Sequence, residues 1–317
     1  MTEKVLHVLG LSGGKDSAAL AIYMRDNYPE IDMTYYFTDT GKELPEVIDL
    51  IDKLEGYVGK KIVDPWEELK SENTASIREK KDFDYWLKQH NNYLPSPQAR
   101  WCTIQMKLVP FEKWITSYLD KGYKIISYVG IRHDEPLRTG YEATSNKNIE
   151  TVMPFRDDGL VRQDIYDILQ NADLFHDTEQ ARNNPLSSQA KGLPGYYDWR
   201  SRSGCTFCFY QRKIEWLRLL EKYPESFAEA EQYEKRAEDE RPDGTFYWLG
   251  KGTPLSTLRE PKRQAQILAD HEKKMQRFMK KRRINVLQVD VDDLDRDFMD
   301  EIYDEQEGGG ACVTCYK

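Results

Sequence analysis

Long apolar runs are absent from this chain of 317 residues. No stretch approaches the roughly 20 consecutive apolar residues that a membrane-spanning helix needs, and 32% of the residues are charged. The N-terminus has neither the basic start nor the apolar run of a secretory signal. We therefore expect a soluble, cytoplasmic protein with no membrane contact, long enough for one large α/β domain with an added helical region.

Positive charge is scarcer than negative charge. The 46 Lys and Arg residues are outnumbered by 55 Asp and Glu residues, which gives a formal net charge of −9. Since affinity for nucleic-acid backbones comes largely from Lys and Arg, this balance argues against nucleic-acid binding over the whole surface. One exception is the helix-like stretch 273–283, which holds seven positive charges. It indicates either a local nucleic-acid contact or a solvated helix face balanced by the acidic segments around it.

Cysteine and histidine are both few, with five of each. The histidines show no spacing typical of a metal site. The cysteines fall as Cys102 alone, Cys205-x-x-Cys208 and Cys312-x-x-Cys315, an odd number that argues against a disulfide framework. In a cytoplasmic chain of this size, such spacing indicates a bound metal, an iron–sulfur cluster or sulfur redox chemistry.

Short β-rich runs alternate with helical patterns in the first half of the chain. The strands are predicted at Val5–Leu9, Met33–Phe37, Lys61–Val63 and Ile125–Val129, and the first two helices at Ser17–Tyr28 and Pro45–Leu54. Strands that alternate with helices form parallel sheets with right-handed crossovers. The predicted fold class is therefore α/β, a parallel twisted sheet flanked by helices, with a helical extension towards the C-terminus.

The alternation is interrupted twice and then ends. Residues 71–100 and 170–204 are irregular, and we expect the first segment to pass over the active edge of the sheet. From Arg212 onward the pattern is helical, and the charge-dense stretch up to residue 240 indicates an exposed helix. We predict three parts: a nucleotide-binding catalytic domain with a cysteine site at 1–211, a helical extension at 212–306, and a flexible glycine-rich tail at 307–317.

The run Ser12-Gly13-Gly14-Lys15-Asp16-Ser17 lies between a predicted strand and a predicted helix. In that setting, backbone N–H groups and the positive end of the helix dipole favour a phosphate group. Lys15 adds a point charge, the serine hydroxyls can donate hydrogen bonds, and Asp16 could hold Mg²⁺ or cap the helix. The run is not a Walker A loop, because Asp16 follows the lysine directly and the glycine spacing differs. The plainer interpretation is a tight turn.

A second polar group follows the predicted strand Met33–Phe37. It consists of Asp39, Thr40, Gly41 and, two residues further on, Glu43. A carboxylate at the end of a strand could hold Mg²⁺ or a nucleotide. The plainer interpretations are a turn residue for Asp39 and a helix cap for Glu43.

A third group, Gly130, Arg132, Glu135 and Arg138, follows the predicted strand that ends at Val129. Two arginines at the carboxyl end of a strand are suited to an anionic substrate, because each offers a planar and permanently charged fork. They could instead form a structural ion pair with Glu135.

Together the three groups resemble the phosphoadenosine phosphosulfate reductase-like branch of the PP-loop ATP pyrophosphatases, over roughly residues 5–215. The resemblance implies that residues 12–17 bind the pyrophosphate part of ATP, with Mg²⁺, and that Asp39, Thr40, Gly41 and Glu43 also line the nucleotide site. It further implies catalytic roles for Lys15, Asp16, Arg132 and Arg138.

The cysteines fit the iron–sulfur members of this family in part. There, a Cys-Cys pair and a later Cys-x-x-Cys hold a [4Fe–4S] cluster. Here Cys102, Cys205 and Cys208 match three ligands, while Trp101 replaces the fourth. These cysteines could hold a cluster with an open iron, a cluster with a fourth ligand from elsewhere, or no cluster. They could also bind structural zinc or stay as free thiols.

Cys312 and Cys315 lie beyond the triple glycine 308–310. Sulfonucleotide reductases also place a catalytic cysteine near a mobile C-terminus, although their usual Glu-Cys-Gly ending is absent here. The pair could carry a persulfide, resolve it as a disulfide or supply the missing cluster ligand. The plainer interpretation is a tail with incidental cysteines.

The PP-loop, the split cysteines and the helical extension are most similar to the sulfurtransferase components of bacterial DNA phosphorothioation systems. That resemblance implies that ATP adenylates an acceptor oxygen, expected to be a DNA backbone phosphate, which sulfur then replaces. It also implies a cysteine desulfurase as sulfur donor, other phosphorothioation proteins as partners, and the stretch 273–283 as the DNA contact. Two competing hypotheses are a sulfonucleotide reductase and a non-catalytic, zinc-stabilised nucleotide-binding module.

Overall fold

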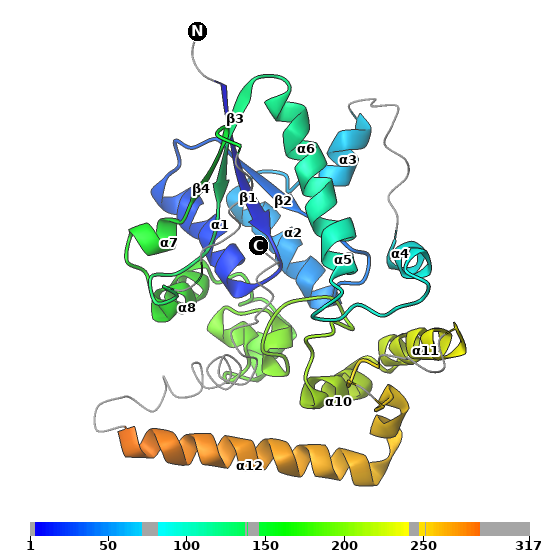
Figure 1. The fold of residues 1–317 in the computed structure, drawn as a ribbon. Helices are drawn as coiled ribbons and strands as arrows, with labels where there is room; N and C mark the ends of the chain where they lie inside the picture. Colours follow the sequence, from blue (N-terminus) through cyan, green and yellow to red (C-terminus); the bar gives the residue numbers. More distant parts are fainter. Residues whose placement is uncertain are drawn as a thin grey trace. The chain divides into compact units, whose positions relative to one another are not determined.

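The computed structural model describes residues 4–71, 82–136, 138, 146–240, 247–250 and 252–285 (Figure 1). These residues form two compact units, each considered by itself. Of the described residues, those up to 86 and those from 100 to 205 form the first unit, and those from 87 to 99 and from 206 onward form the second. The 307–317 tail, with Cys312 and Cys315, lies outside the described residues.

The first unit is built on a parallel sheet, which confirms the predicted α/β fold class. Its described strands are β1 (Lys4–Leu11), β2 (Met33–Phe37), β3 (Tyr123–Tyr128) and β4 (Ile149–Val152), in the spatial order β2-β1-β3-β4. Every pairing is parallel. The predicted strands at Val5–Leu9, Met33–Phe37 and Ile125–Val129 are thus present to within two residues at each end.

β1 is the strand at which the chain changes direction across the sheet. His7 on β1 pairs with Met33 on β2 at one side and with Ile126 on β3 at the other. The crossover after β1 therefore runs to one edge of the sheet, and a later crossover runs to the opposite edge. Ligands of open α/β sheets bind outside the carboxyl ends of the strands at such a point.

Helices cover both faces of this sheet (Figure 1). On one face, α1 (Lys15–Asn27) contacts α2 (Pro45–Val58) and α8 (Arg162–Ala172). On the other, α6 (Val109–Leu119) and α3 (Pro65–Ser71) pack over the strands. There Trp114 and Ile115 of α6 bury Val8, Tyr36 and Ile125, one residue from each of the three neighbouring strands. Removing this apolar surface from water is the main contribution that holds the layers together.

The predicted strand at Lys61–Val63 is wrong. Only Val63 pairs with the sheet, through an isolated bridge in which its N–H donates to the Tyr35 carbonyl and its own carbonyl accepts from the Phe37 N–H, both at 2.9 Å. Asp64 then accepts a hydrogen bond from the Trp66 N–H at 2.9 Å and Pro65 begins α3. Proline is suited to the first turn of a helix and cannot continue a ladder of hydrogen bonds, so the extended run stops at one residue.

The two irregular segments contain only short helices where they are described. The first irregular segment contains α4 (Phe83–Gln89), and it is followed by α5 (Trp101–Thr103) and the π-helical turn η1 (Ile104–Leu108), which continues into α6. The second irregular segment contains α9 (Glu179–Asn183), η2 (Gln189–Lys191) and η3 (Gly195–Asp198), and α7 (Pro154–Asp157) precedes it. π-Helical turns are rare in proteins, and those that occur are often found near functional sites.

The second unit is helical, as predicted for the C-terminal region. It contains α10 (Lys213–Lys222), α11 (Pro224–Glu240), the short helix η4 (Leu255–Arg259) and α12 (Pro261–Asn285). The expectation that the stretch up to residue 240 forms an exposed helix is wrong for one face of α11. Phe227 and Tyr233 are buried there, because they pack on the rings of Trp216 and of Phe207.

Across the described segments, no helix has both the length and the apolar character needed to cross a bilayer.

Candidate active site at the carboxyl ends of the strands

The loop between β1 and α1 requires glycine at Gly13. Its φ of +74° lies in the left-handed region, and a Cβ added there would lie 2.5 Å from Cγ1 of Val47 on α2. Gly14 is extended and forms the N-cap of α1, where no side chain accepts a capping hydrogen bond. Asp16 therefore does not cap the helix, which was one of its two predicted roles.

The two serine hydroxyls hold the loop closed. The Ser17 hydroxyl accepts a hydrogen bond from the Ser12 N–H at 3.1 Å and donates one to the Gly14 carbonyl at 3.1 Å. The Ser12 hydroxyl lies 3.1 Å from the Ser17 hydroxyl and accepts from the Gly14 N–H at 3.3 Å. The hydroxyls thus fix the shape of residues 12–17 from within.

Two tyrosines from η3 contact the same loop, and sequence reasoning missed both. The Tyr196 hydroxyl is fully buried and donates a short hydrogen bond to the Gly13 carbonyl, while the Tyr197 hydroxyl accepts one from the Lys15 N–H at 3.0 Å. Burial raises the pKa of Tyr196 well above its ordinary value. These tyrosines lie more than 180 residues from the loop in an irregular run, so no spacing rule could have identified them.

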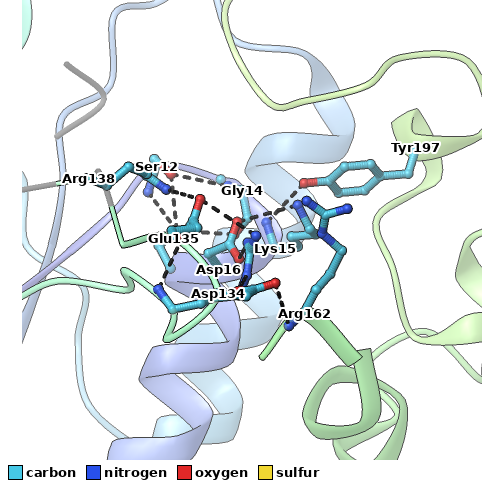
Figure 2. Close-up of polar contacts among 12 residues, drawn as sticks. Ser12, Gly14, Lys15, Asp16, Asp134, Glu135, Arg138, Arg162 and Tyr197 are labelled. Atoms are coloured by element: carbon cyan, nitrogen blue, oxygen red, sulfur yellow. Dashed lines mark hydrogen bonds and ion pairs between the residues drawn. The ribbon is translucent and has the colours of Figure 1, made fainter. Parts of the chain in front are cut away.

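Buried charges surround Asp16. Lys15 Nζ lies 3.4 Å from Asp16 Oδ2, and Arg132 Nη1 donates to Asp16 Oδ1 at 2.8 Å. Arg132 is only 3% exposed, and its Nε donates to Asp134 at 2.9 Å. Figure 2 shows the carboxylates of Asp16, Asp134 and Glu135 gathered beside the start of α1. The structure therefore brings together two sequence-predicted groups that lie more than 110 residues apart.

This network keeps Asp16 ionised. Burial alone would raise the pKa of its carboxyl, but the charge of Lys15, followed by the charge and hydrogen bond of Arg132, outweighs burial and lowers the pKa to about 2. For Arg132, burial alone would lower the pKa, but Asp16, Glu135 and Asp134 together raise it above the ordinary arginine value. The ion pair is thus fully charged at neutral pH.

Gly130 allows the chain after β3 to approach α1. A Cβ at this position would lie 2.9 Å from the backbone carbonyl oxygen of Asp16, closer than side-chain carbons approach in proteins. The missing side chain therefore lets the arginine-bearing loop reach Asp16.

Arg138 forms the predicted ion pair with Glu135. Its Nη1 donates to Glu135 Oε1 at 2.8 Å, while Glu135 Oε2 accepts from the Arg132 N–H at 3.2 Å. The Arg138 side chain is 36% exposed and can also reach a ligand. Arg156, which sequence reasoning missed, donates from Nη2 to the carbonyls of Glu135 and Arg138 and so fixes this loop.

The second polar group lies at the end of β2. Asp39 Oδ1 accepts from the Gly41 N–H at 2.7 Å, which is the turn role weighed for it. The Glu43 side chain is 2% exposed, accepts from the Thr40 hydroxyl at 3.0 Å and lies 3.7 Å from Lys107 Nζ. Glu43 does not cap α2, whose N-cap is Leu44 and has no side-chain cap. A buried carboxylate beside a lysine instead indicates a structural ion pair or a residue of the binding site.

Cys205 is placed against this group. Its thiol lies 3.3 Å from the Thr40 hydroxyl and 3.7 Å from Glu43 Oε1, and residues 43 and 205 form an antiparallel bridge. Cys102 lies on α5, at the start of the helical run that carries Lys107. Cys208 belongs to the second unit.

No disulfide joins Cys102, Cys205 and Cys208. Within the described ranges, no three His, Cys, Asp or Glu side chains are grouped so that they could hold a metal ion. The described donors therefore do not form a complete cluster or zinc site, and Cys102, Cys205 and Cys208 as metal ligands stay a prediction. The same is true of Cys312 and Cys315, which lie outside the described residues.

Comparison with known proteins agrees with this geometry. A family model described as the phosphoadenosine phosphosulfate reductase domain matches residues 7–155, which include the loop after β1, the turn after β2 and the arginine loop after β3.

Three relatives are described as uncharacterized proteins. One from Escherichia phage 186, of 37.8 kDa, is 24% identical over 286 residues, which are 77% of this chain and 80% of the phage protein. A nin region protein of Escherichia phage lambda is 28% identical over 147 residues, 42% of this chain and 50% of the relative. A protein of Methanocaldococcus jannaschii is 27% identical over 271 residues, 83% of this chain and 55% of the relative.

The chain thus spans about half the length of the last two relatives. The loop geometry, the parallel sheet and the family match agree on the same part of the chain. The match over residues 7–155 therefore supports a place for this part of the chain in the phosphoadenosine phosphosulfate reductase-like family of PP-loop proteins, whose members are enzymes that act on nucleotides.

Proposed function

We propose that this protein binds ATP at residues 12–17 and cleaves the bond between its α- and β-phosphates. The observation that carries the proposal is the buried network of Lys15, Asp16 and Arg132 at the carboxyl ends of β1 and β3. It combines a helix N-terminus, a lysine and an arginine at the point where the strand order reverses, which is where α/β sheets bind nucleotides.

The loop would hold the β- and γ-phosphates. α1 has 13 residues, long enough for its dipole to favour an anion at its N-terminal N–H groups. Lys15 adds a cation whose side chain is only 10% exposed. A charge in such a water-poor position interacts more strongly with phosphate than one on the open surface.

Asp16 would act mainly by positioning the two cations. Both of its oxygens face positive groups, Lys15 on one side and Arg132 on the other. Mg²⁺ prefers carboxylate, phosphate and water oxygens, so the ion would enter with the phosphates of ATP and offset their charge, with Asp39 or Asp16 as the nearest predicted protein ligand.

The reaction would be adenylyl transfer. An acceptor oxygen forms a bond to the α-phosphorus, and the bond to the bridging oxygen breaks with its electron pair leaving on pyrophosphate. Arg138 and Arg132 would stabilise the negative charge that develops on the phosphate oxygens. The adenylated oxygen is then a good leaving group, and a sulfur nucleophile can displace it as AMP.

For the acceptor we propose a DNA backbone phosphate, with a cysteine desulfurase as sulfur donor and other phosphorothioation proteins as partners. The support is the resemblance of the motifs and the form of α12, a single helix of 25 residues, about 38 Å long at 1.5 Å per residue. Lys273, Lys274 and Arg277 on it are exposed, in keeping with a local contact to a phosphate backbone. Cys312 and Cys315 would accept or release the sulfur.

A sulfonucleotide reductase is the second candidate, because the matching family model is itself named for phosphoadenosine phosphosulfate reduction. In that case the same loop would bind the phosphates of the sulfonucleotide. A C-terminal cysteine thiolate would form a bond to the sulfur of the sulfate group, and the bond from that sulfur to the bridging oxygen would break with its electron pair leaving on the nucleotide phosphate. The absent Glu-Cys-Gly ending favours the first candidate.

Purified protein incubated with MgATP and an acceptor tests the proposal. We expect pyrophosphate release, reduced about 100-fold or more by Lys15→Ala. The matched control is Lys60→Ala, since Lys60 pairs with Asp32 before β2, at the opposite end of the sheet. Equal loss in both variants would contradict the site. Reduction of adenosine phosphosulfate with thioredoxin, without pyrophosphate release from ATP, would favour the reductase.

A further inference from the structure

The N–H of Lys15 already has an acceptor in this structure. It donates to the Tyr197 hydroxyl at 3.0 Å. Lys15 is the first residue of α1, and its N–H is one of the helix-terminal donors that have no partner within the helix. Under the proposed function, the same N–H faces a phosphate oxygen, so Tyr197 and the nucleotide compete for one donor.

The segment that carries Tyr197 is fastened to the loop on either side of the tyrosine. The neighbouring Tyr196 is fully buried and donates to the Gly13 carbonyl. Ser203 Oγ lies 3.0 Å from the place where a Cβ on Gly14 would stand. Arg200 holds the following turn by donating to the carbonyls of Gly204 and Cys205 at 3.2 and 3.0 Å.

Tyr197 differs from its neighbours in burial. Its side chain is half-buried, whereas Tyr196 has no exposed surface. Moving Tyr196 would leave the Gly13 carbonyl and a buried hydroxyl without partners, which is costly. Moving the Tyr197 ring exposes less, so Tyr197 can leave the loop while Tyr196 stays. Figure 2 shows the Tyr197 hydroxyl directed at the start of α1.

We propose that Tyr197 is a latch on the phosphate loop: its hydroxyl holds the Lys15 N–H in the nucleotide-free protein and yields it to a phosphate oxygen when a nucleotide binds. The inference rests on the proposed function. A charged phosphate oxygen is a stronger acceptor than a neutral phenol, so the exchange favours the nucleotide. Until then the latch keeps the Lys15 N–H hydrogen-bonded. Because nucleotide binding must break this hydrogen bond, the latch lowers the affinity for nucleotide.

The direction in which nucleotide affinity changes when the Tyr197 hydroxyl is removed distinguishes a latch from a ligand contact. If Tyr197 stayed in place and donated its hydroxyl hydrogen to the phosphate, removing the hydroxyl would weaken binding. If Tyr197 is a latch, removing the hydroxyl destabilises the nucleotide-free state more than the nucleotide-bound state and strengthens binding. One net hydrogen bond corresponds to a change of about 2- to 10-fold in the dissociation constant.

The test is calorimetric titration of Tyr197→Phe and Tyr197→Leu with MgATP and with inorganic pyrophosphate. We expect a Kd about 2- to 10-fold lower than that of the unmodified protein for both ligands. The control is Tyr23→Phe. Tyr23 lies on α1, as Lys15 does, but away from the loop, and its hydroxyl donates to Asp158 at 2.7 Å. The Kd of this variant should not change.

An unchanged or higher Kd in the folded Tyr197 variants overturns the latch. If the unmodified protein binds neither ligand, the proposed function fails and the latch falls with it. The two failures are distinguishable, because only the second is seen without any substitution. Circular dichroism establishes that each variant is folded, and two different replacements keep the test valid if one of them does not fold.

Discussion

Replacing Asp16 with asparagine removes the carboxylate charge and keeps the shape of the side chain. In the folded protein, Lys15 and Arg132 lower the pKa of Asp16 to about 2, from 3.8 in the unfolded chain. Each pKa unit corresponds to about 1.4 kcal/mol, so the charge of Asp16 contributes about 2 to 3 kcal/mol to the free energy of unfolding at neutral pH. Asp16→Asn should lose that amount.

The loss should depend on pH in a defined direction. Because the folded-state pKa is below the unfolded-state value, the contribution is present above about pH 4 and is lost as pH falls toward 2. The difference between the unmodified protein and Asp16→Asn should therefore be constant from pH 7 to pH 5 and fall to roughly half by pH 3.

Urea unfolding at a series of pH values, followed by tryptophan fluorescence and circular dichroism, measures this difference. The control is Asp32→Asn, since Asp32 pairs with Lys60 on the surface and is 98% exposed. Such a pair contributes about 0.5 kcal/mol or less. The reasoning is refuted if Asp16→Asn costs no more than Asp32→Asn at pH 7, or if its cost persists undiminished at pH 3.

Three further predictions concern the loop, its support and the second unit. Gly13→Ala should lower the free energy of unfolding by about 2 kcal/mol, because of its positive φ and the contact with Val47. Its matched control, Gly56→Ala, lies within α2 in open space and should instead stabilise by about 0.5 kcal/mol or more; equal effects in a thermal melt would contradict the assignment. Arg156→Ala should speed amide hydrogen exchange at residues 132–135 and leave exchange in β2 unchanged, because the arginine holds two carbonyls of that loop; unchanged exchange in the loop would exclude this positioning role. Burial raises the pKa of Glu234 to about 7 despite hydrogen bonds from the Leu255 and Trp248 N–H groups. Its contribution to stability is therefore present below about pH 4.5 and lost as pH rises through 7, and an NMR titration that found an ordinary glutamate pKa would contradict the burial argument.

The sequence predicted the sheet because its local patterns are strong. β1, β2 and β3 are short apolar runs that end at turn residues, and α1 and α2 follow them at close range. The prediction of a strand at Lys61–Val63 was wrong because a run of three residues does not form a ladder of backbone hydrogen bonds when Pro65 begins a helix directly afterwards. β4 was missed, since Ile149–Val152 is short and carries a glutamate.

Half of the candidate site could be predicted from the sequence. Lys15 and Asp16 lie in a recognisable loop, and Arg132 lies at a fixed distance after a strand. What the sequence could not provide is the contact between them, because a bond between residues 16 and 132 depends on the neighbouring positions of β1 and β3. Tyr196, Tyr197 and Arg156 were missed for the same reason, since their roles arise only from the folded chain.

The central claim is that ATP is cleaved between its α- and β-phosphates, and ATP labelled at the α-phosphorus tests it most directly. We predict that the label is recovered in AMP or in an adenylated acceptor, with unlabelled pyrophosphate released in equal amount, and that Lys15→Ala reduces both products about 100-fold or more. Label recovered in ADP, with inorganic phosphate as the second product, would contradict it.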